Sequence, residues 1–172
     1  MAMNNEFTTS RNTLIVMNMQ RKGVVPVTSA DIRDTEAFIK LAVKLIWDSV
    51  DNGCGCAFAT NGGNVGGTAS GFIKTAEQCE GTLRMLAQLS DSCSFDFGSF
   101  LNALNYGSFT DVIILTPYID NEMTAFVNEL KGNDIEAVFY TTGNIPENAD
   151  GQILHARKFS YTFNTEYGEG TT

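Results

Sequence analysis

The sequence predicts a single domain of the α/β class: a three-layer α/β/α sandwich around a mostly parallel, doubly wound sheet of about six strands. Runs such as 13–18 and 111–116 have the length of strands and are continuously apolar at their centres, which is typical of strands covered on both faces. Longer segments with apolar residues at helical spacing lie between these runs. This alternation predicts parallel strands joined by crossover helices. With 172 residues, the chain has the length of one domain.

Each element is expected from a local pattern. Strands are expected at 13–18, 54–60, 111–116 and 135–141, with a short edge strand near Phe72-Ile73 and a half-exposed edge strand over 158–163. Helices are expected at 32–50, after Thr75, around 97–104 and after Asp120. Thr75-Ala-Glu-Gln78 has the form of a capping box, in which both side chains bind backbone N–H groups. The Asn/Pro/Asp-rich stretch after 135–141 is expected to be a loop, and His155 is expected to lie in a loop as well.

The domain is expected to span residues 11–164, between disordered segments at 1–10 and 165–172. The formal net charge of −9 and the scattered basic residues argue against nucleic-acid binding, because a phosphate-neutralising surface needs clustered Lys and Arg. No apolar run is long enough to cross a bilayer, and the first residues are not expected to be a signal peptide. The four cysteines are therefore expected to be reduced and mostly buried, in a cytoplasmic setting.

Two enzyme motifs are approached but not matched. A P-loop requires Gly-Lys-Thr or Gly-Lys-Ser, whereas Lys74-Thr75 follows an isoleucine. A serine hydrolase requires a nucleophile elbow with G-x-S-x-G spacing, whereas the stretch around Ser70 reads Gly67-Thr-Ala-Ser-Gly71. The glycine-rich stretch is therefore interpreted as a structural turn.

The stretch TLIVMNMQ, residues 13–20, resembles the first strand of isochorismatase-type cysteine hydrolases, in which an apolar strand ends in Asp-x-Gln. In that family an aspartate, a lysine and a cysteine form the catalytic set. Asn18 stands in the place of the aspartate, and a neutral amide cannot act as the base that activates a thiol. Cys79 and Cys93 lie in or beside a mid-chain helix rather than after a late strand. A cysteine hydrolase is therefore the alternative interpretation, and no catalytic residue is assigned.

A longer resemblance covers roughly 130 residues. The chain is similar to the von Willebrand factor A-like half of the bacterial domain-of-unknown-function family number fifty-eight. Three motifs carry the resemblance in the family's order: Ile39-Lys-Leu-Ala-Val43, Thr60-Asn-Gly62 and Leu115-Thr-Pro-Tyr-Ile-Asp120. The resemblance implies a Rossmann-like topology. It also implies MoxR-type AAA+ ATPases as partners, and a longer parent protein that is tethered to the inner face of the membrane.

Many von Willebrand A domains hold Mg²⁺ in a metal-ion-dependent adhesion site, formed by D-x-S-x-S after the first strand together with a threonine and an aspartate from other loops. The resemblance places the three D-x-S-x-S positions at Asn18, Gln20 and Lys22. The Thr-Asp-Gly that follows the fourth strand becomes Thr116-Pro117-Tyr118. Mg²⁺ prefers hard anionic oxygen ligands, so the sequence predicts a degenerate site without a metal. A weak divalent-metal binder remains an alternative.

The leading hypothesis is therefore a non-catalytic protein–protein interaction or assembly domain that needs no cofactor. Its partner would dock at the carboxyl ends of the strands, where ligands bind in open α/β sheets. The candidate partner-binding residues are Asn18, Gln20, Lys22, Asn61, Thr116, Tyr118 and Asp120.

Overall fold

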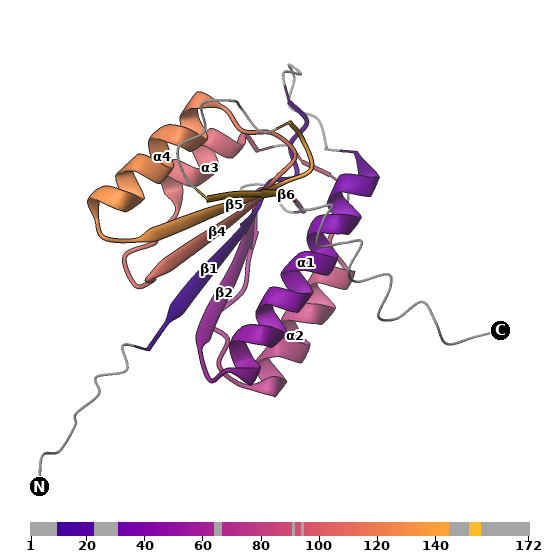
Figure 1. Cartoon of the computed structure of the whole chain (residues 1–172). Helices are drawn as coiled ribbons and strands as arrows, with labels where there is room; N and C mark the ends of the chain where they lie inside the picture. Colours follow the sequence, from indigo (N-terminus) through magenta and orange to yellow (C-terminus); the bar gives the residue numbers. More distant parts are fainter. Residues whose placement is uncertain are drawn as a thin grey trace, which may run out of the picture.

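The computed structural model describes residues 10–22, 31–63, 67–90, 92–93 and 95–144 and the backbone of 152–155. These residues form a six-stranded sheet in the order β3-β2-β1-β4-β5-β6 (Figure 1). The strands are β1 (Asn12–Met17), β2 (Gly55–Thr60), β3 (Thr68–Ala69), β4 (Asp111–Thr116), β5 (Glu136–Thr141) and β6 (Gln152–His155). The helices are α1 (Ile32–Asp51), α2 (Ala76–Ala87), α3 (Phe97–Ala103) and α4 (Asn121–Gly132). The predicted three-layer α/β/α fold with a mostly parallel sheet is confirmed.

Strand β1 is the centre of the sheet. It pairs in parallel with β2 on one side and with β4 on the other, so that Ile15 lies between Phe58 and Ile113. Strands β5 and β6 continue the parallel sheet, whereas the two-residue β3 pairs antiparallel with β2. The continuous apolar run in β1 follows from this position, because a central strand is covered on both faces.

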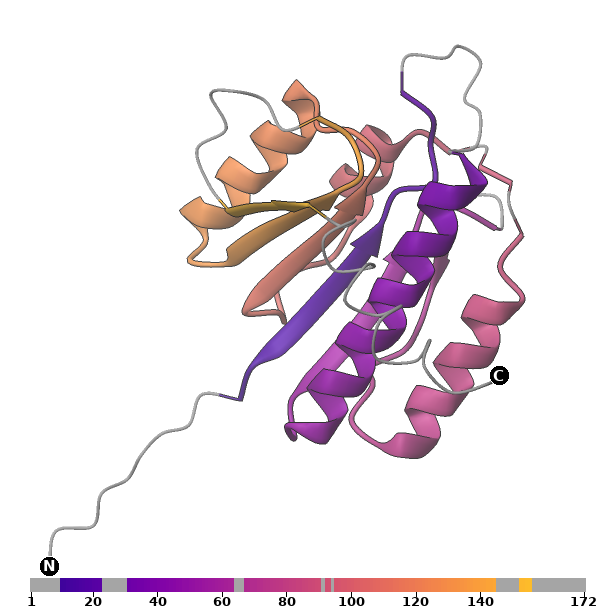
Figure 2. The same ribbon diagram turned by 45° about the vertical axis from the view of Figure 1, so that its right-hand side comes forward.

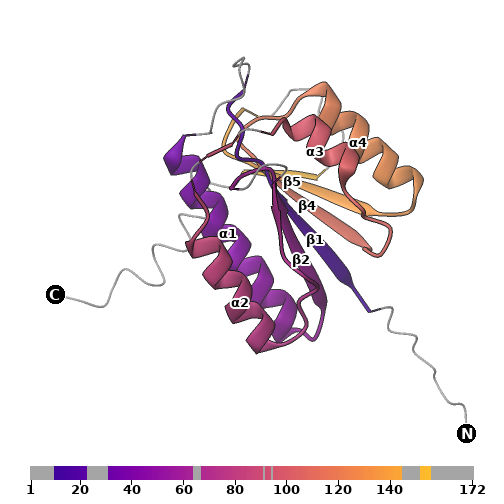
Figure 3. The ribbon, with the colours of Figure 1, turned by 180° about the vertical axis from the view of Figure 1, so that it is seen from behind.

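Helices lie on both faces of the sheet, with α1 and α2 on one side and α3 and α4 on the other (Figures 2 and 3). Successive residues of a strand point to opposite faces, so each strand contributes to two cores. Leu14 and Val16 face α3 and α4, while Ile15 and Met17 face α1 and α2. Within the described residues, no helix is both long and apolar enough to cross a membrane.

Each helix begins at a side chain that accepts a hydrogen bond from a backbone N–H of the first turn. Asp31, Thr75, Asp96 and Asp120 are these N-cap residues. The predicted capping box is present, since Thr75 accepts from the N–H of Gln78 and the Gln78 side chain accepts from the N–H of Thr75. These contacts satisfy N–H groups that have no partner within the helix.

The sheet differs from the prediction at both edges. The expected edge strand near Phe72-Ile73 lies earlier, at β3, and Ile73 forms only an isolated bridge with Cys56. Strand β6 forms in the stretch that was expected to be a loop, and it includes His155. Pairing with β5 creates this strand, and its short sequence QILH carries no strong strand pattern of its own. The strand expected at 158–163 and the flanks 1–9 and 165–172 lie outside the described residues.

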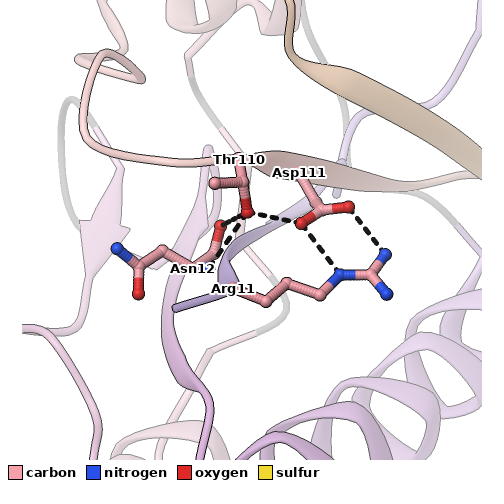
Figure 4. A network of polar contacts seen from close by, with 4 residues as sticks. All are labelled: Arg11, Asn12, Thr110 and Asp111. Carbon is pink, nitrogen blue, oxygen red and sulfur yellow. Dashed lines mark hydrogen bonds and ion pairs between the residues drawn. The ribbon is translucent and has the colours of Figure 1, made fainter. Parts of the chain in front are cut away.

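A polar network closes the amino ends of β1 and β4 (Figure 4). Arg11 donates two hydrogen bonds to the carboxylate of Asp111, at 2.9 and 2.6 Å. Thr110 donates a third to the same carboxylate at 2.6 Å, and its hydroxyl also accepts from the N–H of Asn12 at 3.0 Å. The Asp111 side chain is only 9% exposed. The bidentate contact with Arg11 therefore neutralises a nearly buried carboxylate at the first residue of β4.

The Arg11–Asp111 pair predicts an acid-dependent part of the stability. Burial raises the pKa of Asp111, but the hydrogen bonds from Arg11 and Thr110 and the charge of Arg11 outweigh burial and lower it. Because the folded pKa lies below the unfolded value of about 3.9, the contribution of Asp111 is complete above that pH and is lost as the pH falls towards the folded pKa. We expect Asp111→Asn to reduce the free energy of unfolding at pH 7 by about 1–3 kcal/mol and to flatten its decline in acid. Urea unfolding between pH 2 and pH 7 measures both.

The matched control for this prediction is Glu80→Gln. Glu80 and Arg84 lie 3.8 Å apart on α2, and their side chains are 61% and 78% exposed. Exposed pairs of this kind contribute little, so we expect a change below about 0.5 kcal/mol. Equal losses in the two variants would contradict the assigned role of Asp111.

Candidate interaction site at the carboxyl ends of the strands

The strand order reverses between β1 and β4. The connection from β1 runs through α1 to β2 on one side, and β4 lies on the other side with its following helix on the opposite face. In open α/β sheets ligands bind at such a switch point, in the crevice outside the carboxyl ends of the strands. We call the region of the loops that follow β1, β2 and β4 the crevice. Asn18, Asn61 and Thr116 lie at the ends of β1, β2 and β4, and all three are at most 1% exposed.

The side chains of Asn18 and Thr116 join β1 to β4. The Asn18 amide donates to the Thr116 hydroxyl at 3.0 Å, and this hydroxyl donates to the backbone C=O of Tyr118 at 2.6 Å. The Asn18 carbonyl oxygen accepts from the backbone N–H of Gln20 at 2.8 Å and from the Asn61 amide at 3.4 Å. Asn18 therefore uses both its donor and its acceptor capacity within the protein.

Asn61 joins three loops. Its carbonyl oxygen accepts from the backbone N–H of Met19 at 2.8 Å, and its amide donates to the backbone C=O of Phe95 at 3.0 Å and contacts Cys93 Sγ at 3.3 Å. Gly62 follows, and a side chain there would collide with the Met19 sulfur. The Thr60-Asn-Gly62 motif thus serves the packing of the β1 and β2 loops. Sequence reasoning did not single out Met19, Cys93 or Phe95, because two of them contribute through the backbone, which no residue type signals.

Gln20 and Asp120 fix two helices at the rim. The Gln20 carbonyl oxygen accepts from the N–H of Phe97, at the start of α3, at 2.8 Å. Asp120 Oδ1 accepts from the N–H of Met123, in the first turn of α4, at 2.9 Å. Both side chains are half-buried, so each also keeps a part that faces solvent.

The remaining predicted site residues differ in exposure. Tyr118 is buried, and burial raises the pKa of its hydroxyl; a hydrogen bond with Asn18 opposes this and the charge of Asp120 adds to it. The phenol is therefore neutral at physiological pH. Lys22 is exposed. Of the seven predicted residues, only Lys22, Gln20 and Asp120 can meet a partner directly, while Asn18, Asn61, Thr116 and Tyr118 lie beneath the surface.

The residues present do not fit a magnesium ion. The oxygens of Asn18 and Asn61 and the hydroxyl of Thr116 are neutral, and they already bind one another or the backbone. Within the described part of the chain, no group of three His, Cys, Asp or Glu residues could hold a metal ion. The arrangement is therefore a closed hydrogen-bonded network rather than an open ligand set.

The three buried cysteines do not resemble activated nucleophiles. Burial raises the pKa of Cys56 to about 11, and it also raises the pKa of Cys79 and Cys93. A nucleophilic cysteine needs a lowered pKa, since the thiolate is the reactive form. All four cysteines are free, and three are buried, as the sequence predicted.

Comparison with known proteins supports the fold. No protein-family model and no curated protein matches the chain. The structure is similar to the crystal structure of the SpRpn10 VWA domain, with a TM-score of 0.51 and 13% sequence identity, over 84% of this chain and 87% of that chain. The protein therefore has a von Willebrand A-like fold, as the sequence resemblance implied.

The central role of Asn61 can be tested by unfolding. Asn61→Ala leaves the buried N–H of Met19 without a partner and the C=O of Phe95 with only the weak thiol donor of Cys93, and an unpaired buried group costs about 1–3 kcal/mol. We expect the free energy of unfolding to fall by about 1–3 kcal/mol in urea at pH 7. Asn102→Ala, on the exposed side of α3, is the control and is expected to change it by less than about 0.5 kcal/mol. A small effect of Asn61→Ala would mean that the loops do not depend on this network.

Proposed function

We propose that this protein is a non-catalytic protein–protein interaction domain whose metal-ion-dependent adhesion site is degenerate. The observation that carries the proposal is the closed network of Asn18, Asn61 and Thr116 in the switch-point crevice. A catalytic or metal-binding site needs polar groups that are free to bind a ligand. The amide and hydroxyl groups of these three residues instead form hydrogen bonds with one another or with the backbone. What the crevice offers instead is a rigid surface.

The network acts by positioning. It joins the loops after β1, β2 and β4, and Gln20 extends it to the start of α3. Fixed loops lower the entropic cost of docking, because fewer groups have to become ordered when the partner arrives. In this proposal Lys22, Gln20 and Asp120 contact the partner through their exposed parts, and the buried residues hold them in place.

The sequence motifs suggest which partner to test. The resemblance to the domain-of-unknown-function family number fifty-eight points to a MoxR-type AAA+ ATPase, at the cytoplasmic side of a membrane that anchors a longer parent protein. The three motifs that carry this resemblance lie on α1, at the end of β2 and at the end of β4. Two of them therefore border the same crevice.

Metal independence can be measured by calorimetry. We expect no saturable heat when Mg²⁺ or Mn²⁺ is titrated to millimolar concentrations into protein freed of divalent ions, because carboxylate ligands are missing. Binding that is abolished by Asp120→Ala and retained by Glu77→Ala would overturn the degenerate-site proposal. Binding lost equally in both variants would indicate only weak attraction to an acidic surface.

The partner can be tested by affinity capture from the source cells. We expect the wild-type domain to recover an AAA+ ATPase, and Lys22→Glu to reduce the recovered amount at least tenfold. Lys131→Glu, at the far end of α4, is the matched charge reversal and is expected to recover as much as the wild type. Recovery that both variants retain would place the interface away from the crevice, and no recovery at all would reject the ATPase as the partner.

A further inference from the structure

A second candidate site lies at the β3 edge of the sheet. A cavity of about 370 Å³ opens between the segment 69–73 and helix α2. This volume is within the range of natural ligand pockets, roughly 300–1,000 Å³. The cavity lies at the sheet's edge and is lined by none of the crevice residues described above.

On its outer side, β3 pairs with no other strand of the described sheet. The N–H of Ser70 donates to the C=O of Phe58 at 2.8 Å, and Thr68 pairs with Thr60 in the same register. Hydrogen-bonded and non-hydrogen-bonded pairs alternate along antiparallel strands, so the N–H and C=O of Ala69 point away from β2. Ala69 is exposed, and within the described ranges neither of these groups has a hydrogen-bond partner. An edge of this kind can accept a further strand.

A β-bulge limits this open edge. Ile73 exchanges two backbone hydrogen bonds with Cys56, at 2.7 and 3.0 Å. Between this pair and the pair of Ser70 with Phe58, the two residues Gly71 and Phe72 therefore oppose the single residue Ala57. The bulge and the short β3 make the edge a poor template for unselective strand pairing. Affinity at this edge must come largely from the cavity beside it.

The cavity walls select an apolar side chain. The half-buried Met85 and Phe72, which is 38% exposed, supply apolar surface, whereas Ile73 is only 1% exposed and contributes almost none. On α2, a side chain added at Gly81 would meet nothing within 4 Å, so the wall is open at this residue. Gln78 is held by the N–H groups of Lys74 and Thr75, at 2.8 and 3.2 Å from its carbonyl oxygen, which leaves its amide donors available.

One cation lies near the cavity, beside the lining residue Phe72, although Lys74 itself is not part of the lining. Lys74 Nζ lies 5.3 Å from the centroid of the Phe72 ring, and Lys74 forms no ion pair with any residue that the structure describes. An anionic group beside the apolar side chain would complement this cation, whereas a second cation would be repelled.

We propose that the β3 edge and the adjoining cavity bind an extended segment of a partner polypeptide. The segment adds to the sheet beside β3 through the N–H and C=O of Ala69. One of its apolar side chains enters the cavity between Phe72 and Met85, and a neighbouring acidic residue lies at Lys74. Main-chain hydrogen bonds fix the position of the segment, and the cavity fixes its sequence.

The experiment selects heptapeptides from a random displayed library on the folded wild-type protein, with counter-selection on Gly81→Leu. That substitution fills the cavity from an exposed helical position, where leucine favours the helix more than glycine does. We expect enriched peptides that carry a large apolar residue next to Asp or Glu. Each should bind Gly81→Leu at least tenfold more weakly than the wild type. Ala87→Leu adds the same side chain elsewhere on α2 and should bind as the wild type does.

The backbone contacts are tested separately on the best enriched peptide. Methylating its backbone nitrogens one at a time should weaken binding at least tenfold at one position, and amide exchange at Ala69 should slow in the complex. Circular dichroism and Tm establish that each variant is folded before binding is compared. No enrichment over Gly81→Leu, or binding that survives every methylation, would overturn the proposal. Loss of this binding leaves the crevice proposal untouched, because no crevice residue is altered.

Discussion

The structure depends on one constraint: the amide and hydroxyl groups that are buried at the ends of β1, β2 and β4 find their partners inside the protein. Strands β1, β2 and β4 deliver Asn18, Asn61 and Thr116 to a place that excludes water. An unpaired polar group there would cost free energy, so each amide and hydroxyl has to bind another. The result is a network that holds the loops above the sheet in a single arrangement. A site with metal-binding carboxylates could not close on itself in this way, because like charges repel and need a cation between them.

The same constraint explains how far the site could be predicted. The strand ends follow from the apolar runs, so the placement of Asn18, Asn61 and Thr116 near one another is predictable from the alternation of strands and helices. Their burial is not predictable in the same way. It arises because Asn61 and Gln20 reach the backbone of Phe95 and Phe97, which lie 34 and 77 residues away along the chain. No residue type marks a backbone N–H or C=O as a partner, and the sequence therefore does not indicate that Asn18, Asn61 and Thr116 are buried.

The fold, too, could be predicted from the sequence only in part. The central strands and the helices carry strong local signals, including the capping box at Thr75 and Gln78, and they form where the patterns predict. The two edges of the sheet do not. Strand β6 contains only two consecutive apolar residues, Ile153 and Leu154, and pairing with β5 decides its existence. At the opposite edge, a bulge moves the short strand away from the more apolar Phe72-Ile73 to Thr68–Ala69.

The position of Arg11 has a mechanical consequence. It lies immediately before β1, the central strand, and its guanidinium forms an ion pair with Asp111, the first residue of β4. A pull on the chain from its amino-terminal side enters the sheet at this point, and parallel neighbours would have to slide past each other together. The ion pair connects the start of β1 to β4 and so opposes this sliding, and Arg11 precedes the first residue of β1 that pairs with β4, which is Thr13. Load applied from that side therefore acts on the Arg11–Asp111 ion pair, and on the hydrogen bond from the Gly55 N–H to the Arg11 C=O, before it reaches the β1–β4 ladder.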